Sequence, residues 1–288
     1  MIGGTGTTGR RVAAQLHRRG VQMRIATRHP GSVPPDAVGT AVVFDWNEPE
    51  SYPAAVAGAE RVYLLRPPGV GSDALGKVER FLAEADHAGV RRVVLLHSTA
   101  TGPASMPEIA DLVERSMPEW AVICPSWFMQ NLTGDHPTAR AIRRDGEIAT
   151  ATGAGRVGFI DADDIAATAT ELLLAAGPPN ARFTLTGPDA LSYPQVAAII
   201  SEACGRPVRH LDLSPDELAK RWVAAGLPEP LARLAADADL AIREGGQDFT
   251  TSTVEEVCGR PPRSLRDFAH AHRDAWSAER RYPVKSEA

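Results

Sequence analysis

Short apolar runs alternate with amphipathic stretches along the first half of the chain. The expected strands lie at 22–27, 41–44, 61–65, 92–97 and 120–124. Between the later strands, apolar residues recur at helical spacing near 73–88 and 107–116. The run at 93–96 is continuously apolar, which is typical of a strand buried on both faces. Strands that alternate with helices predict right-handed crossovers and an α/β fold with a doubly wound parallel sheet.

The second half has a different pattern, in which longer helices are separated by short extended pieces. We expect helices near 163–176, 193–203, 215–225, 228–244 and 265–270, with extended pieces at 156–160, 182–186 and 207–213. We therefore divide the chain into a nucleotide-binding core over 1–150 and a smaller, mostly helical substrate lobe over 151–288, with strands that return to the core. Ligands of doubly wound sheets bind beyond the carboxyl ends of the strands, so both parts are expected to meet there.

The chain opens on a glycine-rich sequence, MIGGTGTTG, that leads directly into an expected helix. A turn that feeds a helix presents unpaired N–H groups and a positive dipole end, which suit a pyrophosphate. Gly3 would make the tight turn, Gly6 would let the backbone approach the phosphates, and Gly9 would let the helix pack closely. This context predicts a dinucleotide site of the Rossmann type. Its expected residues are Gly3, Thr5, Gly6, Thr7, Thr8, Gly9 and Arg10.

The strand before this motif is short. A central, buried strand normally carries several apolar residues, whereas only Met1 and Ile2 precede the first glycine. Either translation begins upstream of Met1, or the central strand is a stub.

The end of the first expected strand after the glycines bears on the choice of cofactor. An acidic residue there would hold the ribose 2′-hydroxyl of NAD, but the chain has Arg28 within the sequence ATRH. A guanidinium can stack on adenine and pair with a 2′-phosphate, and Arg10 could be a second cation. The alternative is a solvated surface arginine. We predict NADPH as the cofactor.

Loops after the next strands supply further candidates for the cofactor site. Asp45 and Trp46 are placed to face the adenine edge, or else they are a loop carboxylate and a packing ring. Leu65, Arg66 and Pro67 begin the small, rigid loop LRPPG, which we expect beside the nicotinamide ribose.

Motifs along nearly the whole chain resemble the NmrA-like group of atypical short-chain dehydrogenases/reductases. They are GGTGTTGR, the strand-end Arg28, HSTATG, WAVICPSWFMQN, FIDADDIA near 159–166 and the closing TSTVEEVCGRPPRSLRDF. Members of this group include NADPH-dependent quinone and azo reductases, festuclavine synthases, aromatic-polyketide ketoreductases such as the simocyclinone one, and non-catalytic redox sensors. The resemblance implies the fold, but it leaves the reaction open.

The sequence departs from mainstream short-chain reductases at the catalytic acid. Those enzymes use a Tyr-x-x-x-Lys pair, in which the lysine lowers the pKa of the tyrosine. None of the tyrosines here, Tyr52, Tyr63, Tyr193 and Tyr282, has a lysine four residues later. A carbonyl reductase built on this chain therefore needs another acid.

The remaining candidates follow the last two strands of the first half. By the resemblance, Ser98 is the first choice to orient a substrate oxygen and Thr99 the second. His97 could relay a proton, because its ordinary pKa is near 6.5, or it points into packing. A substrate with a phenol beside its carbonyl could also supply the hydrogen bond itself. Apolar surface for a flat substrate is expected from Pro125, Trp127, Phe128, Met129 and Asn131, although Trp127 and Phe128 could be core. Asp164 is expected to cap a helix.

Composition excludes several classes of function. The net charge of −5 argues against a nucleic-acid or anionic-membrane partner. The three cysteines, Cys124, Cys204 and Cys258, are far apart, so we expect no disulfide framework and no metal, and a reducing cytoplasm. No segment is long enough to span a bilayer. The oligomeric state stays open.

Together these features predict an NADPH-dependent ketoreductase of a bulky, polycyclic aromatic secondary metabolite, as in antibiotic biosynthesis. Hydride transfer would then proceed mainly by proximity and orientation. The alternatives are a quinone, azo or iminium reductase and a non-catalytic NADP(H)-sensing regulator.

Overall fold

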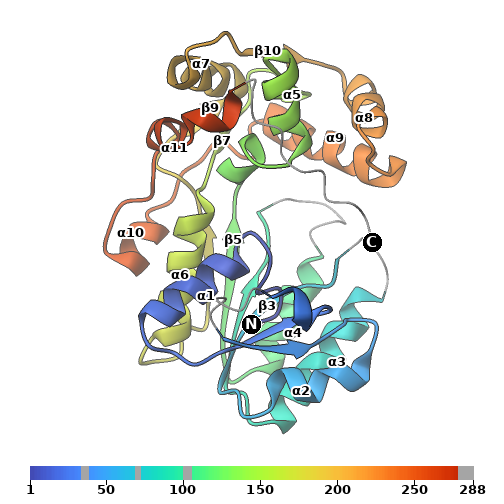
Figure 1. The fold of residues 1–288 in the computed structure, drawn as a ribbon, viewed down its shortest axis with the longest axis vertical. Coiled ribbons are helices and arrows are strands. Elements are labelled where there is room, and N and C mark those ends of the chain that lie inside the picture. The colour runs from blue at the N-terminus through green and yellow to red at the C-terminus, as the bar shows by residue number, and fades with distance from the viewer. Residues whose placement is uncertain (34–38, 69–72, 100–105, 278–288) are drawn as a thin grey trace. The chain divides into compact units, whose positions relative to one another are not determined.

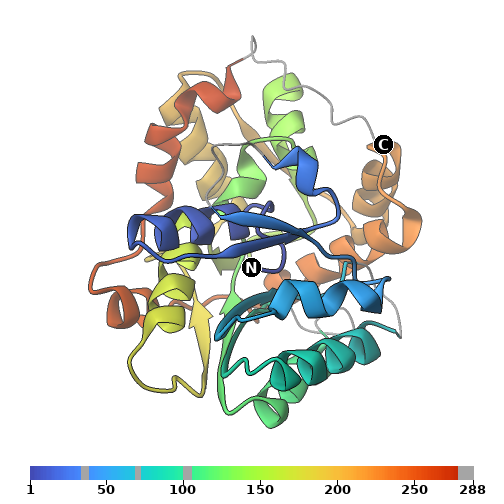
Figure 2. The same cartoon turned by 60° about the horizontal axis from the view of Figure 1, so that its bottom comes forward.

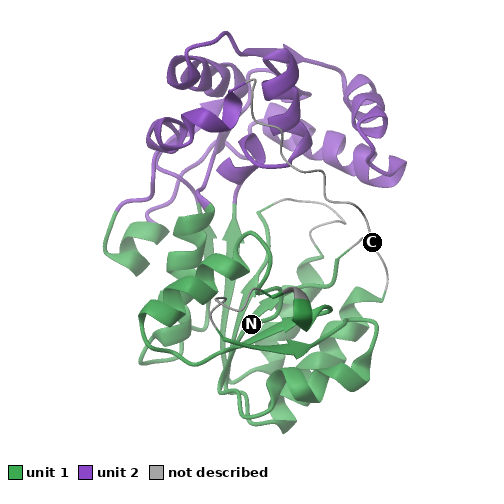
Figure 3. Cartoon of the chain, viewed as in Figure 1, with its two compact units in different colours: residues 1–125, 162–185, 253–260 green, residues 126–161, 186–252, 261–288 purple. Residues whose placement is uncertain are grey.

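Residues 1–33, 39–68, 73–99 and 106–277 are described by this computed structural model (Figure 1). They form two units, each discontinuous in sequence (Figure 3). Unit 1 comprises residues 1–125, 162–185 and 253–260, and unit 2 comprises 126–161, 186–252 and 261–288. The sequence predicts two parts that are each continuous and meet at residue 150. In the structure the chain instead returns to unit 1 after residue 161 and again after residue 252.

Unit 1 is built on parallel strands with helices on both sides. Its main sheet has the order β3 (Arg61–Leu65), β4 (Arg92–Leu96), β5 (Glu119–Pro125) and β8 (Ala181–Leu185), and all of its pairs are parallel. A second parallel pair joins β1 (Arg24–Thr27) to β2 (Thr40–Val43). Its helices are α1 (Gly9–Arg18), α2 (Tyr52–Val56), α3 (Ala74–His87), α4 (Pro107–Ser116), α6 (Ala162–Leu174) and α10 (Thr253–Cys258). Helices α1 and α6 cover one face, and α2, α3 and α4 cover the other (Figures 1 and 2). The predicted α/β fold with a parallel sheet is confirmed.

The core of unit 1 follows from the continuously apolar strands. Val93, Val94 and Leu95 in β4 are fully buried, because helices cover the sheet on both faces. On one side, the rings of Phe44, Trp46, Tyr52 and Phe81 form an aromatic cluster with centroid separations of 5.1 to 5.9 Å.

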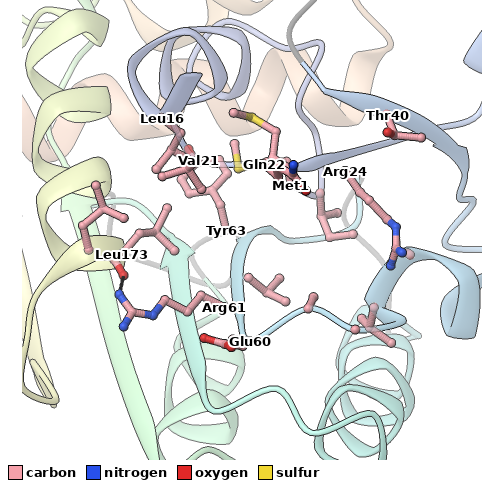
Figure 4. Close-up of a pocket in the computed structure, with 18 residues that line it drawn as sticks. Met1, Leu16, Val21, Gln22, Arg24, Thr40, Glu60, Arg61, Tyr63 and Leu173 are labelled. Carbon is pink, nitrogen blue, oxygen red and sulfur yellow. Dashed lines mark hydrogen bonds between the residues drawn. The ribbon is translucent and has the colours of Figure 1, made fainter. Parts of the chain in front are cut away.

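Met1 and Ile2 lie between β1 and β3 and form hydrogen bonds to both strands. The Ile2 amide donates to the Tyr63 carbonyl (2.9 Å), and the Ala26 amide donates to the Met1 carbonyl (3.1 Å). Below Met1, at the amino-terminal ends of β1 and β3, lies a cavity of about 620 Å³ (Figure 4). Its lining includes Arg24 and Arg61. The cavity therefore lies away from the carboxyl ends of these strands.

A buried arginine holds the end of α6 in unit 1. Arg92, at the start of β4, is 1% exposed. Its guanidinium donates to the carbonyls of Leu172, Leu173, Ala175 and Gly177 at 2.8 to 3.2 Å, and to Glu119 at 2.8 Å. The last carbonyls of a helix have no partner within the helix, so this one side chain satisfies several of them.

Unit 2 combines two short strand pairs with helices. Strand β6 (Glu147–Thr150) pairs in parallel with β10 (Arg209–Asp212), and β7 (Arg156–Gly158) pairs antiparallel with β9 (Ala190–Ser192). Its helices are α5 (Pro137–Asp145), α7 (Tyr193–Cys204), α8 (Pro215–Ala224), α9 (Glu229–Arg243) and α11 (Leu265–Ala271). Its core includes Met129, Phe159, Val196, Phe268 and Trp276.

Unit 2 contains two buried aspartates, Asp161 and Asp239, and the second of them lies on α9. Asp239 on α9 is 8% exposed and accepts a hydrogen bond from the Ala151 amide at 2.8 Å. Burial raises its pKa to about 6, against smaller opposing effects from that amide and from Arg243.

Candidate functional site

The loops after β3 and β4 leave the sheet of unit 1 at the same edge. In the parallel register, Leu65 lies opposite Leu96, and Leu96 lies opposite Ile123. The residues that follow, Arg66 and His97, therefore begin neighbouring loops. The structure thus brings the predicted nicotinamide-side and catalytic segments to one edge, where ligands of such sheets bind.

The glycine-rich loop has the geometry that its sequence predicts. Gly3 has a φ of +75°, which favours glycine, and the Gly6 amide donates to the Gly3 carbonyl at 3.0 Å. A Cβ added at Gly9 would lie 2.1 Å from that same carbonyl oxygen. Only glycine at position 9 lets α1 begin so close to the turn.

Backbone amides at the start of α1 are available for an anion. The Arg10 amide donates to the Gly6 carbonyl (3.1 Å), but within the described chain the amides of Thr7, Thr8 and Gly9 have no hydrogen-bond acceptor. Free amides at the positive end of a helix dipole fit a phosphate group. Residues 3–10 therefore fit the pyrophosphate of a dinucleotide.

Two cations flank this loop without an ion-pair partner among the described residues. Arg28 directly follows β1 and is exposed, and Arg10 is exposed in the first turn of α1. By contrast, Arg11 pairs with Asp163 at 2.7 Å. The guanidinium groups of Arg10 and Arg28 are therefore not neutralised by a neighbouring carboxylate in the described chain.

The next predicted cofactor residues differ in their surroundings. Trp46 is 8% exposed and belongs to the aromatic cluster of unit 1, which favours packing over contact with adenine. The Asp45 carboxylate accepts from the Asn47 amide at 2.8 Å, as in an Asx turn.

The loop after β3 begins beside the glycine-rich loop. Arg66 is half-buried, with its guanidinium 3.9 Å from the Met106 sulfur. A Cβ added at Gly3 would be 3.1 Å from Leu65, so the end of β3 packs against the glycine loop. Gly69, the end of the LRPPG loop, lies outside the described residues.

The catalytic candidates extend β4. The His97 amide donates to the Ile123 carbonyl at 2.8 Å, and its side chain is half-buried. Burial, and then the charges of Arg66 and Arg182, lower the pKa of His97 below its usual value, so the imidazole is neutral at pH 7. The Thr99 hydroxyl donates to the Pro125 carbonyl at 3.4 Å, and the Ser98 side chain is exposed. The rest of the HSTATG motif lies outside the described residues.

The predicted substrate segment lies in unit 2, except for Pro125, the buried last residue of β5. Met129 is fully buried in the core of unit 2, which favours packing over substrate contact. Trp127 and Phe128 are half-buried, and Trp127 packs against the same core. Asn131 is half-buried.

Sequence reasoning missed the partners of two buried aspartates in the FIDADDIA motif. Asp161 is 1% exposed and accepts from Gln130 (2.7 Å) and Arg263 (2.8 Å) in unit 2. Asp164, expected only as a helix cap, forms an ion pair with Arg260 at 2.7 Å in unit 1. Both arginines come from the closing sequence GRPPR, about 100 residues away. The two motifs therefore hold each other in place.

No helix in the described ranges is long and apolar enough to cross a membrane. The same ranges contain no group of three or more His, Cys, Asp or Glu side chains that could hold a metal ion.

The fold and the glycine loop define a dinucleotide-binding protein of the Rossmann type, and comparisons with known proteins agree. The sequence model of a family described as NAD(P)H-binding matches residues 3–176. The uncharacterized oxidoreductase YesF of Bacillus subtilis (strain 168) is 41% identical over 280 residues, which cover 96% of each chain. The NAD(P)H azoreductase of Xenophilus azovorans is 32% identical over 287 residues, covering 96% of this chain and 99% of that one.

A solved structure shows the same fold. It is an NADPH-dependent quinone oxidoreductase from Escherichia coli in complex with NADPH, with a TM-score of 0.82 at 22% identity, and the match covers 94% of this chain and 98% of that one.

The chain belongs to the NAD(P)H-binding family, and its resemblance to the NmrA-like group is confirmed. It is an NAD(P)H-dependent oxidoreductase.

Proposed function

We propose that the protein is an NADPH-dependent reductase of conjugated aromatic acceptors. The observation that carries this proposal is a phosphate-binding loop flanked by cations in a chain that lacks the usual catalytic Tyr/Lys pair. The net reaction converts an uncharged acceptor, NADPH and one proton into the reduced acceptor and NADP⁺; an iminium cation takes up the hydride without a proton. When bound, NADPH supplies the hydride from its nicotinamide ring.

The preference for NADPH rests on charge. The amides of Thr7, Thr8 and Gly9 would hold the pyrophosphate, and Arg28 would pair with the 2′-phosphate, with Arg10 as a second cation. In NAD-preferring folds a carboxylate at the position of Arg28 accepts from the ribose 2′-hydroxyl. Thr27 and His29 flank Arg28, so no carboxylate stands at this strand end.

The acceptor class follows from the missing acid. A simple ketone forms an alkoxide when it takes up hydride, and this charge needs a nearby proton donor. The neutral His97 imidazole is a weak acid, and the Thr99 hydroxyl already donates to Pro125. A conjugated acceptor spreads the incoming charge over its own atoms and depends less on such a donor.

Several acceptors meet this condition. Quinones and azo compounds do so, and so does a polycyclic aromatic ketone whose neighbouring phenol donates a hydrogen bond to the carbonyl oxygen. An iminium ion needs no proton donor for a different reason, because the hydride neutralises its positive charge. The azoreductase relative supports a conjugated acceptor. Ser98 would orient the acceptor atom.

The proposal is tested by following NADPH consumption with a panel of these acceptors, using the wild type and Ser98→Ala. The panel includes an aromatic ketone with its neighbouring phenol free or methylated. We expect turnover with the free phenol, loss with the methylated one, and less than a roughly tenfold decrease in kcat for Ser98→Ala, since the acid is not Ser98. NADP⁺ affinity is the control for an intact fold in the variant.

Two outcomes would contradict this reasoning. A loss of about a hundredfold or more in Ser98→Ala, with normal reduction of the methylated ketone, would make Ser98 the acid. NADP⁺ and NADPH binding without turnover of any acceptor would identify a cofactor-sensing regulator instead.

A further inference from the structure

A cation, Arg66, lies at the edge of the sheet where the acceptor is expected. Arg66 directly follows β3, and His97 directly follows the neighbouring strand β4, in which Leu96 lies opposite Leu65. The carboxyl ends of parallel strands are where such sheets bind their ligands. Arg66 therefore begins the loop next to the one that carries Ser98.

The guanidinium of Arg66 reaches along this edge toward the start of α4. Its Nη1 lies 3.9 Å from the sulfur of Met106, the residue before α4, and 3.5 Å from the Pro67 carbonyl oxygen. Helix α4 follows the loop after β4, so the side chain extends from the end of β3 to the segment that comes after β4. Arg66 is half-buried, so solvent screens its charge only in part.

The charge of Arg66 acts on the neighbouring catalytic candidate. After burial, Arg66 contributes most to lowering the pKa of His97. Arg182 adds to this effect and Asp111 opposes it. Arg182 is itself paired with Asp111 and Glu114 on α4. A positive charge on the His97 ring is therefore disfavoured at this edge, and a negative charge formed at the same place would be stabilised.

We propose that Arg66 is a catalytic residue that selects for uncharged acceptors: its guanidinium contacts the acceptor atom that becomes negative when the hydride is taken up. It thereby stabilises a charge that the Tyr/Lys pair would neutralise in mainstream short-chain reductases. This inference rests on the proposed reductase function.

Two kinds of acceptor differ in how their charge changes. In a quinone, the hydride forms a new bond to the acceptor and an electron pair moves onto a carbonyl oxygen, which gives an anion; a proton from solvent then completes the reduced product. In an iminium cation, the hydride bonds to carbon, the electron pair moves onto nitrogen, and the product is an uncharged amine. A fixed cation therefore stabilises the transition state of the first reaction. It disfavours the second, in which the acceptor is positive until the hydride has been transferred.

The test compares kcat/KM at saturating NADPH for two acceptors of similar size, menadione and the N-methyl-3,4-dihydroisoquinolinium ion. We expect Arg66→Met to lower kcat/KM for menadione by roughly 10- to 100-fold, less than the loss of a fully buried oxyanion donor, because Arg66 is partly solvated. The same variant should raise kcat/KM for the iminium ion by about threefold or more. Arg66→Lys keeps the charge and should keep the wild-type order of preference. Arg182→Met is the matched control, since its charge is already paired with two carboxylates, and its ratio of the two kcat/KM values should stay within about twofold of the wild type.

A second measurement needs no turnover. Removing a nearby cation favours the protonated imidazole, so NMR titration of the His97 ring should give a higher pKa in Arg66→Met than in the wild type. The melting temperature of each variant reports whether its fold is intact.

The proposal is overturned if Arg66→Met changes kcat/KM for both acceptors in the same direction, as expected of a residue that only binds the cofactor. It is also overturned if the wild type reduces only the iminium ion, or if the pKa of His97 does not change. A wild type that binds NADP⁺ but turns over no acceptor would refute the proposed reductase function itself, which is a different result.

Discussion

Replacing Gly9 by alanine tests whether the glycine loop and α1 must approach as closely as the structure shows. The added Cβ would lie 2.1 Å from the Gly3 carbonyl oxygen and 2.8 Å from both the Gly3 carbonyl carbon and the Gly4 Cα. Ordinary contacts begin at 3.4 Å. All of the atoms it meets belong to the backbone, so no flexible side chain can move aside. The turn and the helix must therefore separate by about an ångström, a shift comparable to overpacking a tight core.

The magnitude follows from that displacement. Overpacking typically costs roughly 1–3 kcal/mol of unfolding free energy. In a domain of about 150–250 residues, each kcal/mol corresponds to roughly 2–4 °C in Tm, so we expect a decrease of roughly 2–12 °C. The shift also misplaces the amides of Thr7, Thr8 and Gly9. The loss of one charge-assisted hydrogen bond, about 1.5–3 kcal/mol, would weaken NADP⁺ binding roughly 10-fold or more.

Thermal unfolding monitored by circular dichroism and NADP⁺ titration by calorimetry measure the two effects. Gly76→Ala, within α3, is the matched control, because the nearest atom to its added Cβ is 3.6 Å away. This control is expected to gain about 0.5–1 kcal/mol, since alanine is the better helix residue. If Gly9→Ala melts and binds NADP⁺ like the wild type, the close approach has no part in stability or binding.

Two further predictions concern charge. Arg28→Asp should weaken NADPH binding by roughly one to two decades and favour NADH, because a carboxylate repels the 2′-phosphate and accepts from a 2′-hydroxyl; unchanged dissociation constants for both cofactors would remove Arg28 from the site. For Asp239, the pKa is raised from 3.8 to about 6 in the folded protein, so the folded state binds more protons between these values and its stability falls as pH rises from about 4 to 6. In urea unfolding, the free energy of unfolding of the wild type relative to Asp239→Asn should fall by on the order of 2–3 kcal/mol over this range, and a difference that does not change with pH would contradict the assignment.

Elements with strong local patterns could be predicted from the sequence. Helix α4 (Pro107–Ser116) and strand β3 (Arg61–Leu65) have the predicted bounds, because apolar periodicity and flanking residues define them locally. Helix α5 was not predicted. It buries only Ala139 and Ile142 and is otherwise rich in arginine, so few apolar residues mark it in the sequence.

In the candidate site, features that depend on adjacent residues could likewise be predicted, whereas features that depend on distant residues could not. The roles of Gly3 and Gly9 in the turn could be predicted, since they depend on a few adjacent residues. The burial of Trp46 could not, because it depends on Phe81, which lies 35 residues further along the chain. The Tyr63 hydroxyl donates a hydrogen bond to the Thr8 hydroxyl oxygen at 2.9 Å, which likewise joins positions that no spacing rule connects.

The Arg92 interaction has a consequence for synthesis of the chain. Proteins emerge from the ribosome amino terminus first, and Arg92 precedes its carbonyl partner Leu172 by 80 residues. Until that segment arrives, the guanidinium must stay hydrated, and the β5 edge that later pairs with β8 is open. Unit 1 also takes in residues 253–260, so it can be completed only after residue 260 has been made. The nascent protein therefore exposes an unpaired, apolar strand edge from the synthesis of β5 until that of β8, and a truncated product that ends near residue 150 would expose it permanently.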